Sequence, residues 1–474
     1  MLSLFVILPL LGLVVLNMPL GKGIRGWTVS CVFLLALIQI AAVVWLATAG
    51  APSVSWLDRF LGLRLDADSL SLVLLLSIGI VMLAAVLVGD AAVAGEHRRL
   101  NFGSLLLILL TGMNGTVLLT DLFSLYVFLE VTSVASFILI AFDRKKESLE
   151  GAFKYLMLSA VATVLMLSGI GLLLLVAGST SFSAVALALR SAGGTPVAKI
   201  AMGAFVCGLF IKGGVVPFHG WLPGAYTSAP SSVSVVLAGI VTKVAGIYGL
   251  IRLALSVFPP SQPLNQVFLL IGAVSIVVGA VAAMGQTDMK SLLAYSSISQ
   301  VGYILLGFGC GTKLGVAAAI LHLFNHSIFK ALLFVNAAAI EQRTGGTDMT
   351  RLGGLGLRMP VTGVTNVIGV LSTAGIPPFS GFWSKLVIII ALWQIGHYGY
   401  AALAVLFSVV TLAYLLIMQR RVFFGKTAEH LGVTREAELA ICLPAVLLAG
   451  VATAVGLLFP WLFNTFLFPV GGIM

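Results

Sequence analysis

Long apolar runs separated by short polar segments dominate the pattern along this chain. Several runs reach the roughly 20 residues that a helix needs to cross the hydrocarbon core of a bilayer. Uninterrupted apolar runs of that length predict spanning helices rather than amphipathic surface helices. The fourteen candidate spans lie at approximately 2–20, 27–48, 68–89, 101–119, 122–142, 151–177, 198–224, 229–254, 265–286, 291–310, 313–341, 360–394, 398–423 and 438–465.

Composition supports the same interpretation. Of the 474 residues, 60% are hydrophobic and only 9% are charged, whereas a soluble globular domain carries about 25% charged residues. The net charge of +10 could suggest nucleic-acid binding. However, the basic residues fall in short loops between apolar runs, which is a topology signal. We therefore predict an all-α polytopic membrane protein with the lipid bilayer, and no nucleic acid, as its surroundings.

The basic residues also predict an orientation. With the N-terminus outside, fifteen lie in inner loops: Lys22, Arg25, Arg98, Arg99, Arg144, Lys145, Lys146, Lys290, Arg343, Arg351, Arg358, Arg420, Arg421, Lys426 and Arg435. Six lie in outer loops: Arg59, Arg64, Arg190, Lys199, Arg252 and Lys313. This bias follows the positive-inside rule. It places the chain in the cell (inner) membrane with both termini on the non-cytoplasmic side.

Five basic residues remain inside or at the edge of spans, and all are lysines. They are Lys154, Lys212, Lys243, Lys330 and Lys385, and Glu130 is the one acid well within a span. A charge at the bilayer centre costs about 2.5–3.5 kcal/mol on insertion scales, so each needs a partner, a wet cavity or a neutral form. Lysine suits proton transfer because desolvation lowers its pKa, whereas arginine stays charged.

Two spans carry breaks at matching positions in the two halves of the chain. The seventh reads IKGGVVPFHGWLPGAY, with Pro217 shortly after Lys212, and the twelfth reads STAGIPPFSGFWSKL, with Pro377 and Pro378 before Lys385. Proline interrupts helical hydrogen bonding. Paired interrupted helices are typical of inverted repeats around an ion path, although each could be only a packing kink. In the first break, His219 could bridge the half-helices or cap the backbone.

Helix eleven carries His322, His326 and Lys330 in LHLFNHSIFKALLF. Spacing of four places the three side chains on one stripe of the helix. The pattern favours a titratable ladder. Two histidines at this spacing also fit a metal site, but no acidic or thiol ligand joins them, and a hydrogen-bonded helix seam is a further alternative.

Glu130 and Lys154 each have a simpler alternative. A buried glutamate favours a counter-ion for a buried lysine, or else a purely structural salt bridge. Lys154 begins the sixth span, where Glu150 at i−4 could form an ordinary surface pair with it.

Motifs for energy conversion are missing from the sequence. It contains no G-x-x-x-x-G-K-[ST] loop, no strand-borne G-x-G-x-x-G and no haem or cluster ligand set, and its four cysteines lie within apolar runs. We therefore expect no cofactor, no bound metal and no redox site in this chain. A gradient or partner subunits must drive it.

Four long motifs carry a family resemblance. They are VPFHGWLPGAYTSAPSSVSVVLAGIVTKVAGIYGLIR, DMKSLLAYSSISQVGYILLG, HLFNHSIFKALLF and GIPPFSGFWSKL. With them, approximately residues 100–425 resemble the antiporter-like membrane subunits of complex I, membrane-bound [NiFe] hydrogenases and Mrp-type cation/proton antiporters. The resemblance implies fourteen helices with two inverted five-helix repeats. The expected divisions are 1–100, 101–254, 265–423 and 438–474.

The resemblance also implies roles for single residues. Glu130 matches the family's helix-five glutamate, and Lys212 matches its partner lysine. Lys243 looks like the bridging lysine of helix eight. His322, His326 and Lys330 look like the helix-eleven relay, Lys385 like the outlet group, and Lys154 like a lysine that several members carry.

We therefore expect a proton-translocating subunit of a complex I-related oxidoreductase, of the quinone-reductase or membrane-hydrogenase type. The alternative is the D-type subunit of an Mrp Na⁺/H⁺ antiporter. The short segment after the last span argues against the largest family members, which end in a long lateral helix. A lone secondary transporter for an organic solute is a third class, but the chain offers proton carriers rather than groups for a substrate.

Overall fold

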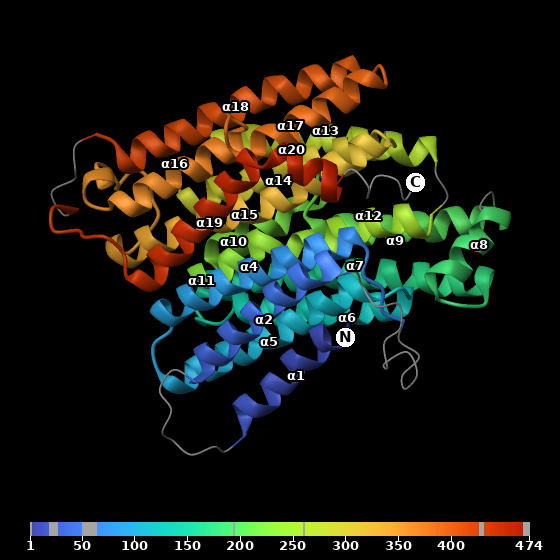
Figure 1. The fold of residues 1–474 in the computed structure, drawn as a ribbon, viewed down its shortest axis with the longest axis horizontal. Helices are drawn as coiled ribbons and strands as arrows, with labels where there is room; N and C mark the ends of the chain where they lie inside the picture. Colours follow the sequence, from blue (N-terminus) through green and yellow to red (C-terminus); the bar gives the residue numbers. More distant parts are fainter. Residues whose placement is uncertain are drawn as a thin grey trace. The chain divides into compact units, whose positions relative to one another are not determined.

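The computed structural model describes residues 2–18, 27–49, 64–192, 195–258, 261–425 and 431–467. Nearly all of the described part of the chain is helical (Figure 1). Within the described residues, extended pairing is limited to three isolated bridges. Four basic residues used in the orientation argument, Lys22, Arg25, Arg59 and Lys426, lie outside the described residues.

The first half of the chain contains the helices up to Ser256. They are α1 (Leu4–Asn17), α2 (Trp27–Ala49), α4 (Ser69–Ala92), α5 (Glu96–Leu118), α6 (Leu122–Ile140), α7 (Lys146–Ala177), α8 (Phe182–Ala192), α9 (Pro196–Gly213), η1 (Phe218–Trp221), α10 (Leu222–Ser228), α11 (Ser231–Val236), η2 (Leu237–Val241), η3 (Lys243–Tyr248) and α12 (Gly249–Ser256).

The second half begins at Gln262. Its helices are α13 (Gln262–Met284), α14 (Met289–Gly309), α15 (Lys313–Thr344), η4 (Leu355–Leu357), α16 (Pro360–Ala374), α17 (Ser380–Gln394), α18 (Tyr398–Phe423), α19 (Leu439–Leu457), α20 (Phe459–Leu462) and η6 (Phe463–Leu467).

Helix occupies each of the fourteen predicted spans, so the prediction of an all-α polytopic membrane protein is confirmed. By length and composition, 12 helices in the described part of the chain can cross a membrane. The shorter apolar helices include α1 and the two halves of the predicted twelfth span, α16 and α17. Helix α8 was not predicted, and it holds Arg190, which the sequence placed in an outer loop.

The chain forms two compact units. Unit 1 contains Met1–Met82, Gly95–Trp221 and Val241–Ser261, and unit 2 contains Leu83–Ala94, Leu222–Ile240 and Gln262–Met474. In unit 1 the main packing partners are α7 with α9 and α5 with α6. In unit 2, α13 packs on α14, and α15 packs against α14, α16, α17 and α19.

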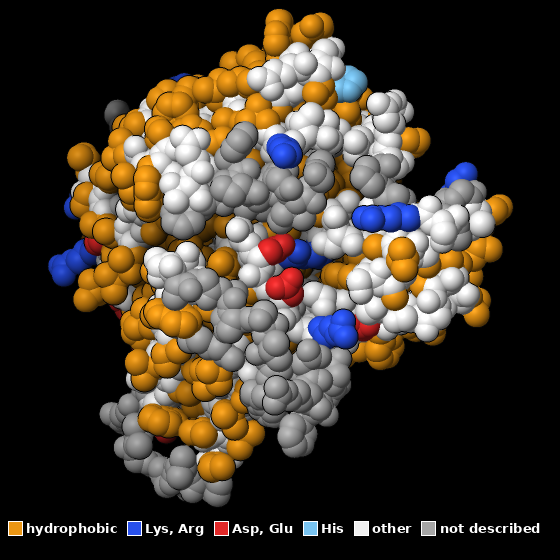
Figure 2. Space-filling view, turned by 45° about the vertical axis from the view of Figure 1, so that its right-hand side comes forward, with side chains coloured by type: hydrophobic (Ala, Val, Ile, Leu, Met, Phe, Trp, Pro, Cys, Tyr) orange, Lys and Arg blue, Asp and Glu red, His pale blue; other side chains and the backbone are white. Residues whose placement is uncertain are grey.

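Many of the exposed side chains are large and apolar. Large exposed side chains lie along several long helices, for example Phe153 and Leu175 on α7 and Val409 on α18. Figure 2 shows hydrophobic side chains over much of the face that it presents. A surface of this kind suits lipid or neighbouring subunits rather than water.

A matching cap fixes one helix pair in each unit. Asp121 precedes α6, where its side chain accepts a hydrogen bond from the Ser124 amide and another from the Thr180 hydroxyl beyond α7. Asp288 precedes α14 and accepts bonds from the Ser291 amide and the Thr347 hydroxyl beyond α15. In each case the threonine follows its aspartate by 59 residues.

The caps therefore align α6 with α14 and α7 with α15, residue for residue. This local correspondence supports the internal repeat that the two broken spans suggested. The exact division of the chain into repeats stays a prediction.

Candidate functional site

A buried ion pair lies inside unit 1. The Lys212 ammonium on α9 is 2.9 Å from Oε1 of Glu130 on α6. The Lys212 side chain is 0% exposed, and that of Glu130 is 27% exposed. Two residues predicted from the sequence, far apart in the chain, thus meet as a pair. Such a pair is costly to bury unless further hydrogen bonds satisfy both groups.

Hydroxyl groups supply those hydrogen bonds. Lys212 Nζ donates to Ser133 Oγ at 2.8 Å and to Ser159 Oγ at 3.0 Å. Thr163 Oγ1 donates to Glu130 Oε1 at 2.7 Å. Hydroxyls both donate and accept, so this shell can pass a proton as well as stabilise the charges. Sequence reasoning missed these three residues, because serine and threonine are ordinary in membrane helices.

The first helix break lies just beyond Lys212. Helix α9 ends at Gly213, Gly214 adopts a left-handed conformation with φ 64, and the Val216–Pro217 bond is cis. The indole of Trp221 supports the end of the helix by donating to Ile211 O at 2.9 Å, a carbonyl that also accepts from the Gly214 amide. Broken backbone at membrane depth requires such protein partners.

His219 lies in this break on the short helix η1 and is half-buried. Its predicted role as a bridge or cap stays a prediction.

Lys243 occupies an irregular part of helix eight. Its side chain is fully buried, and it opens the π-helical segment η3. π-Helical turns are rare and occur frequently at functional sites. Packing against α9 is close: a Cβ added to Gly246 would lie 2.2 Å from the Gly213 Cα. The sequence predicted the lysine but not the π-helix.

The second break places Lys385 against free backbone carbonyls. Helix α16 ends at Ala374, Gly375 has φ 85, and the Pro377–Pro378 bond is cis. Lys385 Nζ donates to Thr373 O at 2.9 Å and Ala374 O at 3.3 Å. The last carbonyls of a helix lack intrahelical partners and carry partial negative charge. Among the described residues, Lys385 forms no ion pair, so carbonyls replace a carboxylate here.

The ammonium of Lys385 also lies over an aromatic ring. It is 4.5 Å from the centroid of Tyr303. The tyrosine hydroxyl donates to Ala404 O at 2.8 Å. A cation over an aromatic face is stabilised without a counter-charge.

The helix-eleven stripe is completely buried in unit 2. His322, His326 and Lys330 on α15 are each 0% exposed. The two imidazole rings are nearly parallel, with centroids 6.4 Å apart. Lys330 Nζ donates to Leu293 O at 3.0 Å and Ser296 Oγ at 2.8 Å, both on α14. The single stripe predicted from the spacing is therefore present.

His322 links this stripe to the second break. Its Nδ1 lies 2.8 Å from Ser384 Oγ, and Ser384 directly precedes Lys385. Within the described residues, no three His, Cys, Asp or Glu side chains cluster as metal ligands. The three titratable side chains and Lys385 thus form one buried polar region.

Lys154 and Lys290 depart from the buried set in opposite ways. The Lys154 side chain is 54% exposed and its ammonium is 2.5 Å from Glu150. This is the i,i+4 surface pair that the sequence analysis gave as the alternative to a functional role. Lys290, which the sequence analysis placed in an inner loop, is instead 2% exposed. Its ammonium is 2.6 Å from Glu341, which also accepts a hydrogen bond from Ser231. Lys290 is therefore a buried ion-pair partner.

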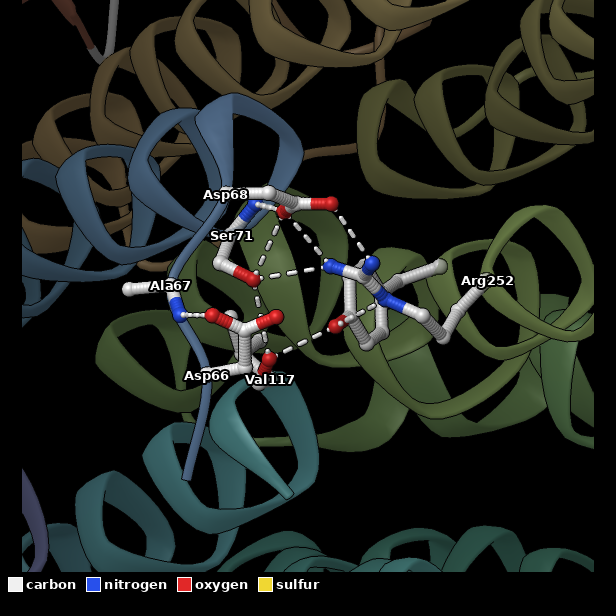
Figure 3. A network of polar contacts seen from close by, with 7 residues as sticks. Asp66, Ala67, Asp68, Ser71, Val117 and Arg252 are labelled. Carbon is white, nitrogen blue, oxygen red and sulfur yellow. Dashed lines mark hydrogen bonds and ion pairs between the residues drawn. The ribbon is translucent and has the colours of Figure 1, made fainter. Parts of the chain in front are cut away.

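Arg252 is a further residue that the sequence misplaced. It lies within α12 rather than in an outer loop, and only 12% of its side chain is exposed. Figure 3 shows its guanidinium reaching Asp68 and Ser71 at the start of α4. Burial raises the pKa of the Asp68 carboxyl, but the Arg252 guanidinium and Ser71 outweigh burial and hold that pKa below its usual value.

The residues from Glu130 to Lys385 lie within the segment of this chain that matches a known protein family. The family described as NADH:quinone oxidoreductase/Mrp antiporter, transmembrane, matches residues 120–411. This chain belongs to that family. It is an antiporter-like membrane subunit and a multi-pass membrane protein.

Relatives come from both branches of the family. The D-type subunit of the Na⁺/H⁺ antiporter from Alkalihalophilus pseudofirmus is 32% identical over 78% of this chain and 75% of its own length. The N-type subunit of the NADH-quinone oxidoreductase from Desulforudis audaxviator is 34% identical over 74% of this chain and 71% of its own. A chain of the Mrp complex from a Dietzia species is 27% identical, with a TM-score of 0.89 over 100% of this chain and 98% of its own.

Proposed function

We propose that this antiporter-like subunit translocates protons along the buried titratable residues of its two units. The observation that carries the proposal is the Glu130–Lys212 pair, whose ammonium is 0% exposed and 2.9 Å from the carboxylate. A fully buried lysine with a single carboxylate partner binds its proton more firmly with the partner close than with it displaced. Moving one relative to the other would therefore load and release a proton.

The other residues extend the proposal. In unit 2, protons enter along Lys330, His326 and His322, and Lys385 beside the broken helix is the outlet group. Lys243 is the bridging lysine of the path. The Ser133, Ser159 and Thr163 hydroxyls lie close enough to the pair to carry a proton to or from it. Lys154 is left out of this path, because its ammonium is exposed and bonded to Glu150.

Substitution of Lys212 tests the proposal. In the assembled complex, Lys212→Ala should lower proton translocation by about 100-fold, the lower part of the range for a positioned proton-transfer group. Lys212→Arg should also fail, because arginine does not release its proton at working pH. Lys154→Ala is the matched control. Full stoichiometry in either Lys212 variant, with normal assembly, would show that the pair is structural.

In this proposal the chain is one subunit of a larger membrane complex. The sequence argument favours a complex I-related oxidoreductase, and the similarity to the N-type subunit of NADH-quinone oxidoreductase supports it. The second candidate is an Mrp-type antiporter, supported by the fold similarity to the Mrp complex chain and by the D-type relative. In the first case redox chemistry elsewhere in the complex drives the protons, and in the second a sodium gradient exchanges with them.

Purification of the native complex separates these hosts. Co-purifying dehydrogenase or hydrogenase subunits, with proton uptake that needs an electron donor, would establish the first. Small antiporter subunits, with sodium-dependent proton movement and no need of a donor, would establish the second. The chain would lie in the cell membrane with both termini outside. Labelling of single cysteines placed in the 143–146 loop, which is expected inside, and at Ser191, which is expected outside, would test this orientation.

A further inference from the structure

Unit 1 contains a hollow that the proposed proton path does not use. It has a volume of about 1100 Å³ and lies among α1, α5, α6 and α7. It is separate from the Glu130–Lys212 pair, because neither residue lines it. Its walls combine charged side chains from the α6–α7 loop and the start of α5 with apolar side chains from α6 and α7.

Basic side chains gather at one end of this hollow. Arg98, Arg144 and His97 line it together with a single acid, Asp143. Arg98 donates to Asp143 Oδ1 at 2.8 Å and lies over the Phe142 ring, 5.2 Å from its centroid. The Asp143 carboxylate thus neutralises one of the two guanidiniums. The exposed Arg144 leaves this end with a surplus positive charge.

Apolar side chains form the remainder of the hollow. Leu149, Phe153 and Leu156 on α7 are 50%, 60% and 40% exposed, and Ile138 on α6 is 42% exposed. From Leu149 to Leu156 the helix rises about 10 Å. The hollow therefore changes from cationic to apolar along the direction of a spanning helix.

We propose that this hollow binds an anionic phospholipid. The lipid phosphate would pair with Arg144 and Arg98, and an acyl chain would lie along Phe153 and Leu156. Basic pockets at the cytoplasmic edge of spanning helices bind anionic headgroups in this way, and guanidinium groups match phosphate geometry. The anionic headgroup of a phospholipid would lie at the basic end of the hollow, and its acyl chain would lie along the apolar part. The basic loops of the sequence also place this end at the cytoplasmic leaflet.

One variant removes the charge with little disturbance of the backbone. Arg144 has a φ of 55, in the left-handed region that asparagine tolerates better than most residues. Arg144→Asn therefore removes the guanidinium while favouring the same conformation. Arg190→Gln is the matched control, since Arg190 lies on α8 and does not line the hollow.

Native mass spectrometry of the full-length chain, titrated with phosphatidylglycerol or phosphatidylcholine, measures the binding. The unaltered chain should retain phosphatidylglycerol in preference to phosphatidylcholine. Arg144→Asn should weaken phosphatidylglycerol binding by about tenfold, as expected for loss of one charge-assisted contact. Arg190→Gln should bind as the unaltered chain does. Arg144→Lys keeps the charge but not the fork of donors, so its phosphatidylglycerol binding should lie between that of the unaltered chain and that of Arg144→Asn. Phe153→Ser should shorten retention of the lipid without changing the headgroup preference.

Three results would overturn the proposal. The first is equal binding of both lipids by the unaltered chain, and the second is phosphatidylglycerol binding by Arg144→Asn equal to that of the unaltered chain. The third is loss of a neighbouring subunit from the Arg144→Asn complex when the separated chain binds no lipid preferentially, which would assign the hollow to a protein partner. Proton translocation is not part of either readout, so failure here leaves the proton path untouched.

Discussion

Helices α7 and α15 occupy equivalent places beside matching caps, yet their surroundings are opposite. Each has 32 residues. In the most apolar stretch of α7, 28% of the residues are buried, whereas 94% are buried in the corresponding stretch of α15. A helix that is apolar all round and enclosed can hold titratable groups only where neighbours satisfy them. Helix α7 instead presents large apolar side chains outward.

The cap alignment compares their chemistry directly. The shift that carries Asp121 onto Asp288 also carries Ser159 onto His326 and Thr163 onto Lys330. Unit 1 thus has hydroxyls where unit 2 has titratable groups. Its ion pair instead joins α6 and α9, where Lys212 meets the carboxylate of Glu130. The two units thus carry their titratable groups on different helices of the same backbone arrangement.

The largest effect on proton translocation is expected from a substitution that removes a titratable group of α15. In the assembled complex, Lys330→Ala should lower proton translocation by about 100-fold. Its counterpart Thr163→Ala removes one hydrogen bond to Glu130 and should lower it by about tenfold at most. Proton uptake by reconstituted vesicles measures both. Lys330→Arg should not restore transport, because arginine keeps its proton. Restoration by arginine would mean that Lys330 only holds α14.

The next effect concerns the stacked histidines. His326→Phe keeps the ring volume but removes both nitrogens, so translocation should fall by about tenfold or more with assembly intact. Ser159→Ala, at the equivalent position on α7, removes one of two hydroxyl acceptors of Lys212 and should have the smaller effect. Equal effects of the two substitutions would contradict the distinction between the units.

A smaller effect, on the stability of the protein, is expected where glycines allow two helices to pack closely. A Cβ on Gly246 would approach Gly213, and one on Gly381 would lie 1.8 Å from Ser372 O. Gly246→Ala and Gly381→Ala should each destabilise the protein by about 1–3 kcal/mol through overpacking. Thermal unfolding in detergent measures this. Gly171→Ala on exposed α7 is the control, since nothing lies within 4 Å of its Cβ position, and a matching loss there would contradict the packing argument.

The smallest effect is expected at the surface of α7. Lys154→Ala removes an exposed i,i+4 pair with Glu150, and such pairs add little to stability. Translocation and unfolding temperature should both stay unchanged. A loss of translocation comparable to that of Lys330→Ala would return Lys154 to the path, as the family resemblance first implied.

Some of the site could be predicted residue by residue. Glu130, Lys212, Lys243 and Lys385 stood out because charge inside an apolar run is costly and rare. The stripe on α15 followed from spacing alone. By contrast, Ser133, Ser159 and Thr163 gave no signal, since hydroxyls occur throughout membrane helices. Arg252 and Lys290 were misplaced because helix ends blur the border between loop and span.

The sequence by itself determined that the chain crosses a membrane many times, where two of its helices break, and that charges deep within the apolar runs, such as Lys212 and Lys243, must be enclosed. These follow from run length, proline and the cost of desolvation, which are local properties. Only the tertiary structure decided which groups meet: the carboxylate of Glu130 for Lys212, and two carbonyls for Lys385. It also decided that α15 is enclosed and α7 is exposed. Both helices are apolar, and what covers an apolar helix depends on residues distant in the chain.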